Sequence, residues 1–241
     1  MERVSTGING LDEMLGGGYP RNRIILVRGG PGSGKTIFSI QFIVDGAKKG
    51  ERGIYITLEE PLDLVKTNIA SFKWNIEGLE KKGLIKMIDS SQIVYRQSIP
   101  IKGDSDTKLK ISDVADSIRS TVENFRAERL AVDPITSAVI HQRFPTDKRF
   151  EILELVKTLR RLKCSSLITS EFSSPSMEGE FYVEEYLADG VIILSKSLQN
   201  FKVIKTILIE KMRGVKHDDQ PRKYGITDEG FVVYPTEAVT P

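Results

Sequence analysis

Residues 29–36 read Gly-Gly-Pro-Gly-Ser-Gly-Lys-Thr, a complete G-x-x-x-x-G-K-[ST] phosphate-binding loop whose two flanks constrain the local fold. The apolar run at 24–27 is typical of a buried strand, and residues 37–44 continue without a helix breaker before Gly46. Strand, glycine-rich loop and helix in this order suit a phosphate site, because the loop turns its N–H groups inward and the helix adds its positive dipole end. The chain is predicted to bind a nucleoside triphosphate.

Each position of this loop has a separate predicted task. The glycines let the backbone approach the phosphates where a Cβ would crowd them. Lys35 is predicted to reach the β- and γ-phosphates, and the Thr36 hydroxyl to bind Mg²⁺. The predicted nucleotide-binding residues of the loop are Gly30, Pro31, Gly32, Ser33, Gly34, Lys35 and Thr36.

Length and charge narrow the class of protein. The 241 residues suit one α/β domain spanning 1–241, and 35 Lys and Arg against 33 Asp and Glu give a net charge of +2. That balance does not indicate a dedicated binder of polyanions. Cys164 is the one cysteine, which excludes an internal disulfide, and its apolar neighbours predict a buried thiol. No apolar leader opens the chain and no stretch approaches the roughly 20 apolar residues of a membrane span, so we expect a cytoplasmic protein.

Apolar runs alternate with helical patterns along most of the chain, which predicts a mainly parallel sheet with helices on both faces. After Asp189 the pattern changes to consecutive strands, predicted to form an antiparallel C-terminal edge. The polar stretch at 90–110 is predicted to be a loop. The predicted strands are 24–27, 53–58, 85–89, 130–133, 166–169, 191–194, 202–211, 224–227 and 231–234, and the clearest helical patterns are 111–125 and 152–162.

Three acidic residues are candidates for the chemistry. Asp133 ends the strand predicted at 130–133, as a Walker B carboxylate does, and would share the Mg²⁺ ion with Thr36. Glu59 and Glu60 follow the strand predicted at 53–58, where ligands gather in open parallel sheets. They would polarise the attacking water, or they form an ordinary acidic strand-to-helix turn ahead of Pro61; the residues alone leave both interpretations open.

Lys211 and Arg213 are candidates of a different kind. Alternate residues of a strand face the same side, so these two cations point together while Met212 points away. A solvated basic strand end is the alternative. The chain also lacks the Asn-Lys-x-Asp motif of GTPases and the Leu-Ser-Gly-Gly-Gln motif of transporter ATPases, which argues against both classes.

Motifs along nearly the whole chain resemble the KaiC-like ATPases of the RecA superfamily, especially their single-domain archaeal members. Matching segments are Ser-Thr-Gly-Ile-Asn-Gly-Leu-Asp at 5–12 and Tyr-Ile-Thr-Leu-Glu-Glu-Pro at 55–61. Ser-Phe-Lys-Trp at 71–74 is similar to the family's Ser-Phe-Gly-Trp. The most specific segments are Lys-Met-Arg-Gly-Val-Lys-His at 211–217 and Tyr-Gly-Ile-Thr-Asp-Glu-Gly at 224–230.

The resemblance implies a RecA-like P-loop NTPase fold and a hexameric ring that holds ATP between subunits. The expected partner is therefore a second copy of the chain, with a further protein partner possible. Glu59 and Glu60 would be the catalytic carboxylates, with Lys35 acting on the phosphates.

The same resemblance assigns further residues that would contact a nucleotide. Lys211 and Arg213 would reach the γ-phosphate of the neighbouring subunit's nucleotide, as the arginine finger does in other NTPases. Ser71 and His217 resemble nucleotide-contacting positions, although an isolated His on a polar loop is as often a surface residue.

Two positions depart from the autophosphorylating members of the family. Glu184 and Glu185 stand where those members carry adjacent Ser and Thr. A phospho-acceptor is missing at these places, so we do not expect autokinase activity there.

The segment after the fifth predicted strand differs from that of DNA-binding recombinases. Glu171 stands where they carry a γ-phosphate-sensing glutamine, and residues 172–195 hold five acidic residues and no Lys or Arg. Nucleic acid needs cations opposite its phosphates, so it is not an expected partner. A weaker DNA contact stays open through Arg143, Lys148 and Arg149.

The leading hypothesis is a Mg²⁺-dependent ATPase, assembled as a ring, whose hydrolysis drives or reports a conformational state of a protein. One alternative is a recombinase paralogue with a DNA-dependent ATPase. The other is a nucleotide-dependent interaction module with little turnover.

Overall fold

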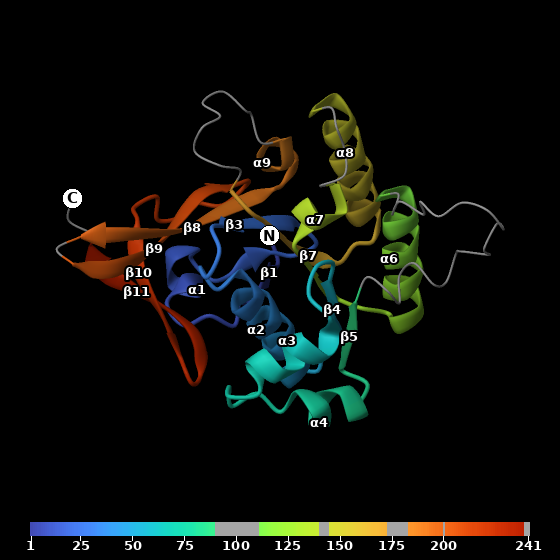
Figure 1. Ribbon diagram of the computed structural model, residues 1–241, viewed down its shortest axis with the longest axis horizontal. Helices are drawn as coiled ribbons and strands as arrows, with labels where there is room; N and C mark the ends of the chain where they lie inside the picture. Colours follow the sequence, from blue (N-terminus) through green and yellow to red (C-terminus); the bar gives the residue numbers. More distant parts are fainter. Residues whose placement is uncertain (90–110, 140–144, 173–182, 200, 239–241) are drawn as a thin grey trace.

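The computed structural model describes residues 1–89, 111–139, 145–172, 183–199 and 201–238, and the loop predicted at 90–110 lies outside them. The described part contains a nine-stranded sheet in the order β11-β10-β9-β8-β3-β7-β6-β4-β5 (Figure 1). A short pair, β1 (Arg3–Val4) and β2 (Tyr19–Pro20), lies apart from it. The strands of the sheet are β3 (Ile24–Gly29), β4 (Gly53–Thr57), β5 (Ile85–Asp89), β6 (Arg129–Asp133), β7 (Ser165–Ser170), β8 (Gly190–Gln199), β9 (Lys202–Met212), β10 (Arg222–Thr227) and β11 (Gly230–Ala238).

Six neighbouring strands, from β5 to β8, run parallel, and β9, β10 and β11 continue the sheet antiparallel. The mainly parallel sheet and its antiparallel edge are therefore confirmed. The strand predicted at 191–194 is part of β8, which pairs antiparallel with β9 on one side and parallel with β3 on the other. A parallel pairing needs a crossover of a dozen or more residues. Residues 171–189 supply it, which the run of strand patterns alone did not reveal.

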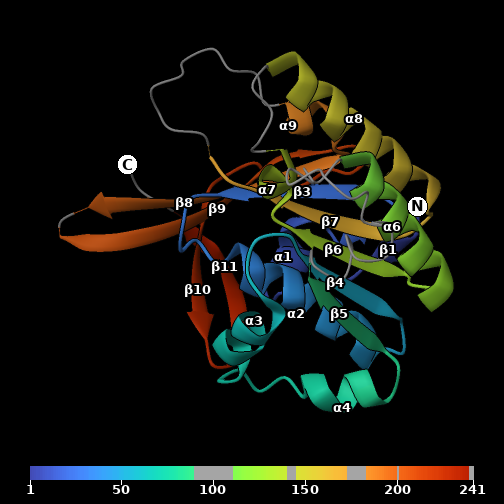
Figure 2. The ribbon, with the colours of Figure 1, turned by 45° about the vertical axis from the view of Figure 1, so that its right-hand side comes forward.

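Helices cover both faces of the sheet, as predicted (Figure 2). The alternation within β3 shows the two layers: Ile25 and Val27 belong to one apolar core, whereas Ile24 and Leu26 belong to the other. The first core is covered by α1 (Leu11–Met14), α2 (Lys35–Lys48), α3 (Leu62–Ile69) and α4 (Ile76–Lys81). The second is covered by α6 (Ile111–Phe125), α7 (Ile135–Val139), α8 (Pro145–Arg161) and α9 (Val183–Leu187).

The hairpin of β8 and β9 extends beyond the rest of the sheet (Figures 1 and 2). β8 pairs with β3 only from Gly190 to Leu194, and its remaining residues pair with β9 alone. Because Leu194 lies beside Gly29, the hairpin projects past the end of β3 at which the phosphate loop begins.

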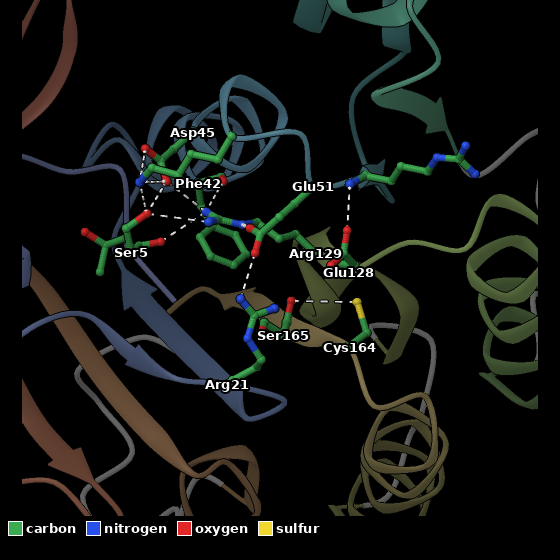
Figure 3. Close-up of polar contacts among 12 residues, drawn as sticks. Ser5, Arg21, Phe42, Asp45, Glu51, Glu128, Arg129, Cys164 and Ser165 are labelled. Atoms are coloured by element: carbon green, nitrogen blue, oxygen red, sulfur yellow. Dashed lines mark hydrogen bonds and ion pairs between the residues drawn. The ribbon is translucent and has the colours of Figure 1, made fainter. Parts of the chain in front are cut away.

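Arg129 opens β6 with a guanidinium group that is almost fully buried, and Figure 3 shows the polar cluster around it. Its Nε donates to Glu51 at 2.6 Å, and one terminal nitrogen donates to Asp45 at 3.1 Å. The same nitrogen donates to the carbonyl oxygens of Ser5 and Phe42, at 3.0 and 2.9 Å. One side chain therefore joins β6 to α2, to the chain ahead of β4 and to the N-terminal segment.

Arg129→Met is expected to lower the free energy of unfolding by about 3 kcal/mol, because two carbonyl oxygens and two carboxylates lose their buried donor. Burial alone would raise the pKa of Glu51, but hydrogen bonds from Arg21 and Arg129 outweigh it and lower that pKa. The stability that Glu51 contributes is therefore present above its unfolded-state pKa and lost as the pH falls through its folded-state pKa. Urea unfolding at neutral pH measures the loss.

The matched control is Arg119→Met. Arg119 forms an ion pair with Asp116 in which both side chains are about half exposed, and such pairs contribute at most about 1 kcal/mol. Equal losses in the two variants would show that the buried cluster adds nothing beyond a surface charge pair.

Candidate nucleotide-binding site

The phosphate loop has the geometry that its sequence predicts. β3 ends at Gly29, and α2 begins at Lys35 with Gly34 as its N-terminal cap. Gly34 has a φ of +91°, and a Cβ there would lie 2.8 Å from the side chain of Ile226. Gly32 also has a positive φ, +69°, so both positions favour glycine for conformational reasons.

A cleft of about 430 Å³ opens at this loop, between α2 and the carboxyl ends of the parallel strands. The remaining loop positions lie beside it: the Gly30 carbonyl oxygen accepts from Lys35 at 3.3 Å, and Ser33 is fully buried. Eight predicted site residues line the cleft: Pro31, Gly32, Gly34, Lys35, Thr36, Glu59, Glu60 and Asp133.

Lys35 points back onto its own loop. Its Nζ donates to the carbonyl oxygen of Gly29 at 2.8 Å and lies 3.3 Å from Glu171 Oε1. Glu171 follows β7 and lines the same cleft. From the neighbouring strand, Lys196 of β8 donates to the Pro31 carbonyl oxygen, so the protruding hairpin is in contact with the phosphate loop.

Asp133 is held by three hydroxyl groups. Thr36 and Tyr55 donate to its Oδ2 at 2.7 and 2.8 Å, and Thr169 donates to its Oδ1. Burial and the nearby Asp133 raise the pKa of Tyr55, so the phenol keeps its proton and acts as a donor. Tyr55 and Thr169 were not among the predicted site residues, because their roles depend on β4 and β7 flanking β6.

Thr36 and Asp133 fit a magnesium ion. Mg²⁺ binds hard oxygen ligands and takes few from the protein when phosphates and waters supply the rest. A hydroxyl and a carboxylate 2.7 Å apart at the foot of the phosphate loop are such a pair. Within the described part of the chain, no group of three or more His, Cys, Asp or Glu forms a metal site of its own.

Glu59 and Glu60 lie where β4 leads into α3, at the edge of the cleft. Glu59 Oε2 accepts from the Ser137 hydroxyl of α7 at 2.9 Å. The Glu60 backbone N–H donates to the Thr57 hydroxyl at 3.1 Å. Both carboxylates therefore belong to a turn that is held by hydrogen bonds. Ser137, which donates to Glu59, was not among the residues predicted from the sequence.

Lys211 and Arg213 lie at the opposite end of the sheet from the phosphate loop. β9 ends at Met212, beside Gly190, the first residue of β8, whereas the phosphate loop begins beside Leu194. At about 3.3 Å per residue, these two levels of the sheet are about 13 Å apart. Neither cation lines the cleft of its own chain.

Both cations donate hydrogen bonds to backbone carbonyl groups of α9. Lys211 Nζ donates to the Glu185 carbonyl oxygen at 2.5 Å, and Arg213 donates to the Tyr186 carbonyl oxygen at 3.0 Å. Arg213 also lies 3.8 Å from Asp189. Burial, and then the adjacent Arg213, lower the pKa of Lys211.

The other assigned residues are also placed outside the cleft. Ser71 is exposed after α3, and half-buried His217 follows β9 with Nδ1 3.2 Å from the Val215 carbonyl oxygen. Glu184 is buried and accepts from the Ser170 hydroxyl, and Glu185 pairs with Arg28. Arg143, one of the cations considered for DNA, lies outside the described residues.

Cys164 is buried, as predicted, and burial raises the pKa of its thiol to about 12. Among the described helices, none is both long and apolar enough to cross a bilayer.

The fold and this cleft define a P-loop nucleotide-binding protein of the RecA type. A sequence profile of the KaiC ATPase family matches residues 4–238. The chain therefore belongs to the KaiC ATPase family.

Several relatives cover the chain almost completely. A UPF0273 protein of Thermotoga maritima is 34% identical over 98% of both chains. The solved structure of the KaiC-like protein PH0186 from Pyrococcus horikoshii is 32% identical, covers 97% of this chain and 99% of its own, and superposes with a TM-score of 0.82. The circadian clock protein KaiC3 of Synechocystis is 32% identical over 99% of this chain, which spans 47% of that protein.

Lys35→Ala is expected to abolish detectable ATP binding and leave the fold intact, because Lys35 is the cation that the motif fixes at the phosphates. Fluorescent-nucleotide titration measures the binding, and circular dichroism measures the fold. Lys48→Ala, at the exposed end of the same helix, is the matched control and should bind normally. Tight binding by the Lys35 variant would refute the phosphate-loop assignment.

Proposed function

We propose that this chain, as one domain, is a Mg²⁺-dependent ATPase that hydrolyses ATP at the interfaces of a homo-oligomeric ring, with a hexamer as the expected size. One juxtaposition carries the proposal: Thr36 and Asp133 lie 2.7 Å apart beside the phosphate loop, and Glu59 and Glu60 line the same cleft. A structural glycine turn would not require this combination of groups.

Within the cleft, each group has a distinct task. Lys35 would exchange its contact with Glu171 for the phosphates, which are stronger anionic partners. Thr36 and Asp133 would hold Mg²⁺, which neutralises charge on the β- and γ-phosphates when it is bound. The hydroxyl groups of Tyr55 and Thr169 fix the Asp133 carboxylate in position.

Glu59 and Glu60 would orient the attacking water and accept its proton. Glu59 is the better held side chain, because the Ser137 hydroxyl donates to its carboxylate. Both side chains are exposed within the cleft, so water can reach them.

The position of the two cations supports a site shared between subunits. Lys211 and Arg213 do not line the cleft of their own chain, so in a ring they would act on a neighbour's nucleotide. Ser71 and His217 also lie outside that cleft, so a nucleotide that they contact would be the one bound by a neighbouring subunit. We infer that ATP turnover drives or reports a conformational state of a protein, and we expect the protein to act in the cytoplasm.

ATPase activity measured with and without single-stranded DNA, on a sample of known mass, tests this function. We expect Mg²⁺-dependent turnover that DNA does not raise at physiological salt, because residues 172–195 carry five acidic residues and no basic ones. Severalfold stimulation that fades steeply with added salt would favour a DNA-dependent recombinase paralogue. Turnover at background in every condition would leave a nucleotide-dependent interaction module.

A further inference from the structure

Strands β10 and β11 of the antiparallel edge pack against the phosphate loop. A Cβ at Gly34 would lie 2.8 Å from Ile226 of β10 and 3.6 Å from Phe231 of β11. Tyr224 of β10 stacks on Phe231 with ring centroids 4.4 Å apart, and Phe231 meets Phe38 of α2 edge-on at 5.1 Å. Ile226, Phe231 and Tyr224 do not line the cleft, so they support the loop from its other side.

The hydroxyl group of Tyr224 contacts the backbone of the loop. It donates to the Ser33 carbonyl oxygen at 2.8 Å, and both residues are buried, with Tyr224 5% exposed and Ser33 0% exposed. Burial raises the pKa of Tyr224 to about 12, so the phenol keeps its proton and remains a donor at neutral pH. The Ser33 carbonyl group is therefore held in the direction of β10.

The direction of this carbonyl group also sets the direction of the next N–H. In a trans peptide the C=O and N–H bonds lie in one plane and point opposite ways. The Ser33 carbonyl and the Gly34 N–H belong to the same peptide, so the N–H is directed away from β10 and toward the cleft that Gly34 lines. Backbone N–H groups turned into a loop of this kind are the donors that hold phosphates.

Lys196 of β8 makes the equivalent contact one turn earlier in the loop. Its Nζ donates to the Pro31 carbonyl oxygen, and a Cβ at Gly32 would lie 3.2 Å from that nitrogen. The Pro31 carbonyl shares a peptide with the Gly32 N–H, which therefore points away from Lys196. Gly32 and Gly34 have φ angles of +69° and +91°. Because glycine adopts either sign of φ readily, the peptides before these two residues turn over easily unless their carbonyl groups are held.

We propose that Tyr224 and Lys196 are positioning residues of the nucleotide site, which fix the peptides before Gly34 and Gly32 with their N–H groups directed at the phosphates of ATP. Neither side chain lines the cleft, so each acts through the loop and not by touching the nucleotide. This role rests on the nucleotide binding proposed above, and it depends neither on the ring nor on hydrolysis. It gives the antiparallel edge a task in the site of its own subunit.

Tyr224→Phe tests this role, because it removes the hydroxyl group and keeps the stacked ring. We expect the Kd for ATP, measured by fluorescent-nucleotide titration with Mg²⁺, to rise roughly tenfold, because the loop without its donor holds the binding conformation only part of the time. The KM should rise with it, whereas kcat at saturating ATP should change little. An unchanged Kd would overturn the role of Tyr224.

Tyr19→Phe is the matched control. Tyr19 is 1% exposed, its ring packs against Phe42, and its hydroxyl group has no hydrogen-bond partner within the described part of the chain. The control should bind ATP as tightly as the wild-type protein. An equal rise of Kd in both variants would also overturn the proposal, because loss of any buried hydroxyl group would then suffice.

Lys196 provides a second and independent pair of variants. Its side chain is exposed, so its replacement should leave the fold intact. Lys196→Met removes the donor and should raise the Kd for ATP severalfold, whereas Lys196→Arg keeps a donor and should restore binding. Lys202→Met, at the exposed start of β9, is the control and should bind normally. Equal affinities of the Met and Arg variants would overturn the role of Lys196.

The wild-type protein, titrated alongside, separates this role from the proposed function. If it binds ATP and the Tyr224 and Lys196 variants bind as tightly, the positioning role fails and the nucleotide site stands. If the wild-type protein itself does not bind ATP, the proposed function and the positioning role both fail.

Discussion

Arg213→Ala is expected to lower ATP turnover by roughly 10³–10⁵-fold while ATP binding persists, the loss typical of removing an arginine finger. Arg213 lies at the opposite end of the sheet from its own phosphate loop and does not line its own cleft, so we expect it to act on the nucleotide of a neighbouring subunit. Mixing this inactive variant with Lys35→Ala should restore part of the activity. Mixed assemblies contain some interfaces at which an intact loop faces an intact Arg213.

Arg160→Ala is the matched control for Arg213→Ala. Arg160 and Arg213 lie 3.7 and 3.8 Å from the same Asp189 carboxylate, and each donates to a carbonyl oxygen of α9. Loss of the shared ion pair alone would affect both variants equally. Mixed assemblies confirmed by mass, yet without recovered turnover, would show that Arg213 acts within its own chain or only structurally.

Glu59→Gln combined with Glu60→Gln is expected to retain ATP binding and to lower turnover by roughly 10²–10⁴-fold, the usual contribution of a general base. The substitutions keep the shape of the turn and remove both carboxylates from the cleft. Single-turnover measurements on each single variant would assign the larger effect, which we expect at Glu59, because Ser137 anchors it.

Asp63→Asn is the control, since it removes one carboxylate in the first turn of α3 without lining the cleft. Wild-type turnover in the double variant would move the base to another carboxylate of the cleft, with Asp133 or Glu171 next to be tested.

Local patterns in the sequence predicted most of the fold. The phosphate loop, the helices on both faces and the strands of the sheet depend on neighbouring residues, and such periodicity is legible without a structure. The family followed from the same local motifs, and the match to residues 4–238 confirms it. The role of each site residue stays a prediction.

The order of the strands in the sheet could not be predicted from the sequence. For that reason the sequence analysis also missed the residues that contact Asp133 from neighbouring strands. Tyr55 and Thr169 reach Asp133 only because β4 and β7 lie on either side of β6. The parallel pairing of β8 with β3 likewise depends on a crossover, not on the composition of β8. Long-range pairing is set by the packing of the whole sheet, whereas a single strand shows only which of its residues face inward.

The separation of Arg213 from its own phosphate loop has an arithmetic consequence if the site is shared. Each copy then carries two halves of different sites, and a head-to-tail row of copies completes one site fewer than it has members. Closing the row joins the two unmatched ends, so that the last incomplete site is completed and every nucleotide then has its finger. The last subunit to join completes two sites, whereas each earlier subunit completes one. Activity per molecule would therefore rise with protein concentration and level off once the rings are closed.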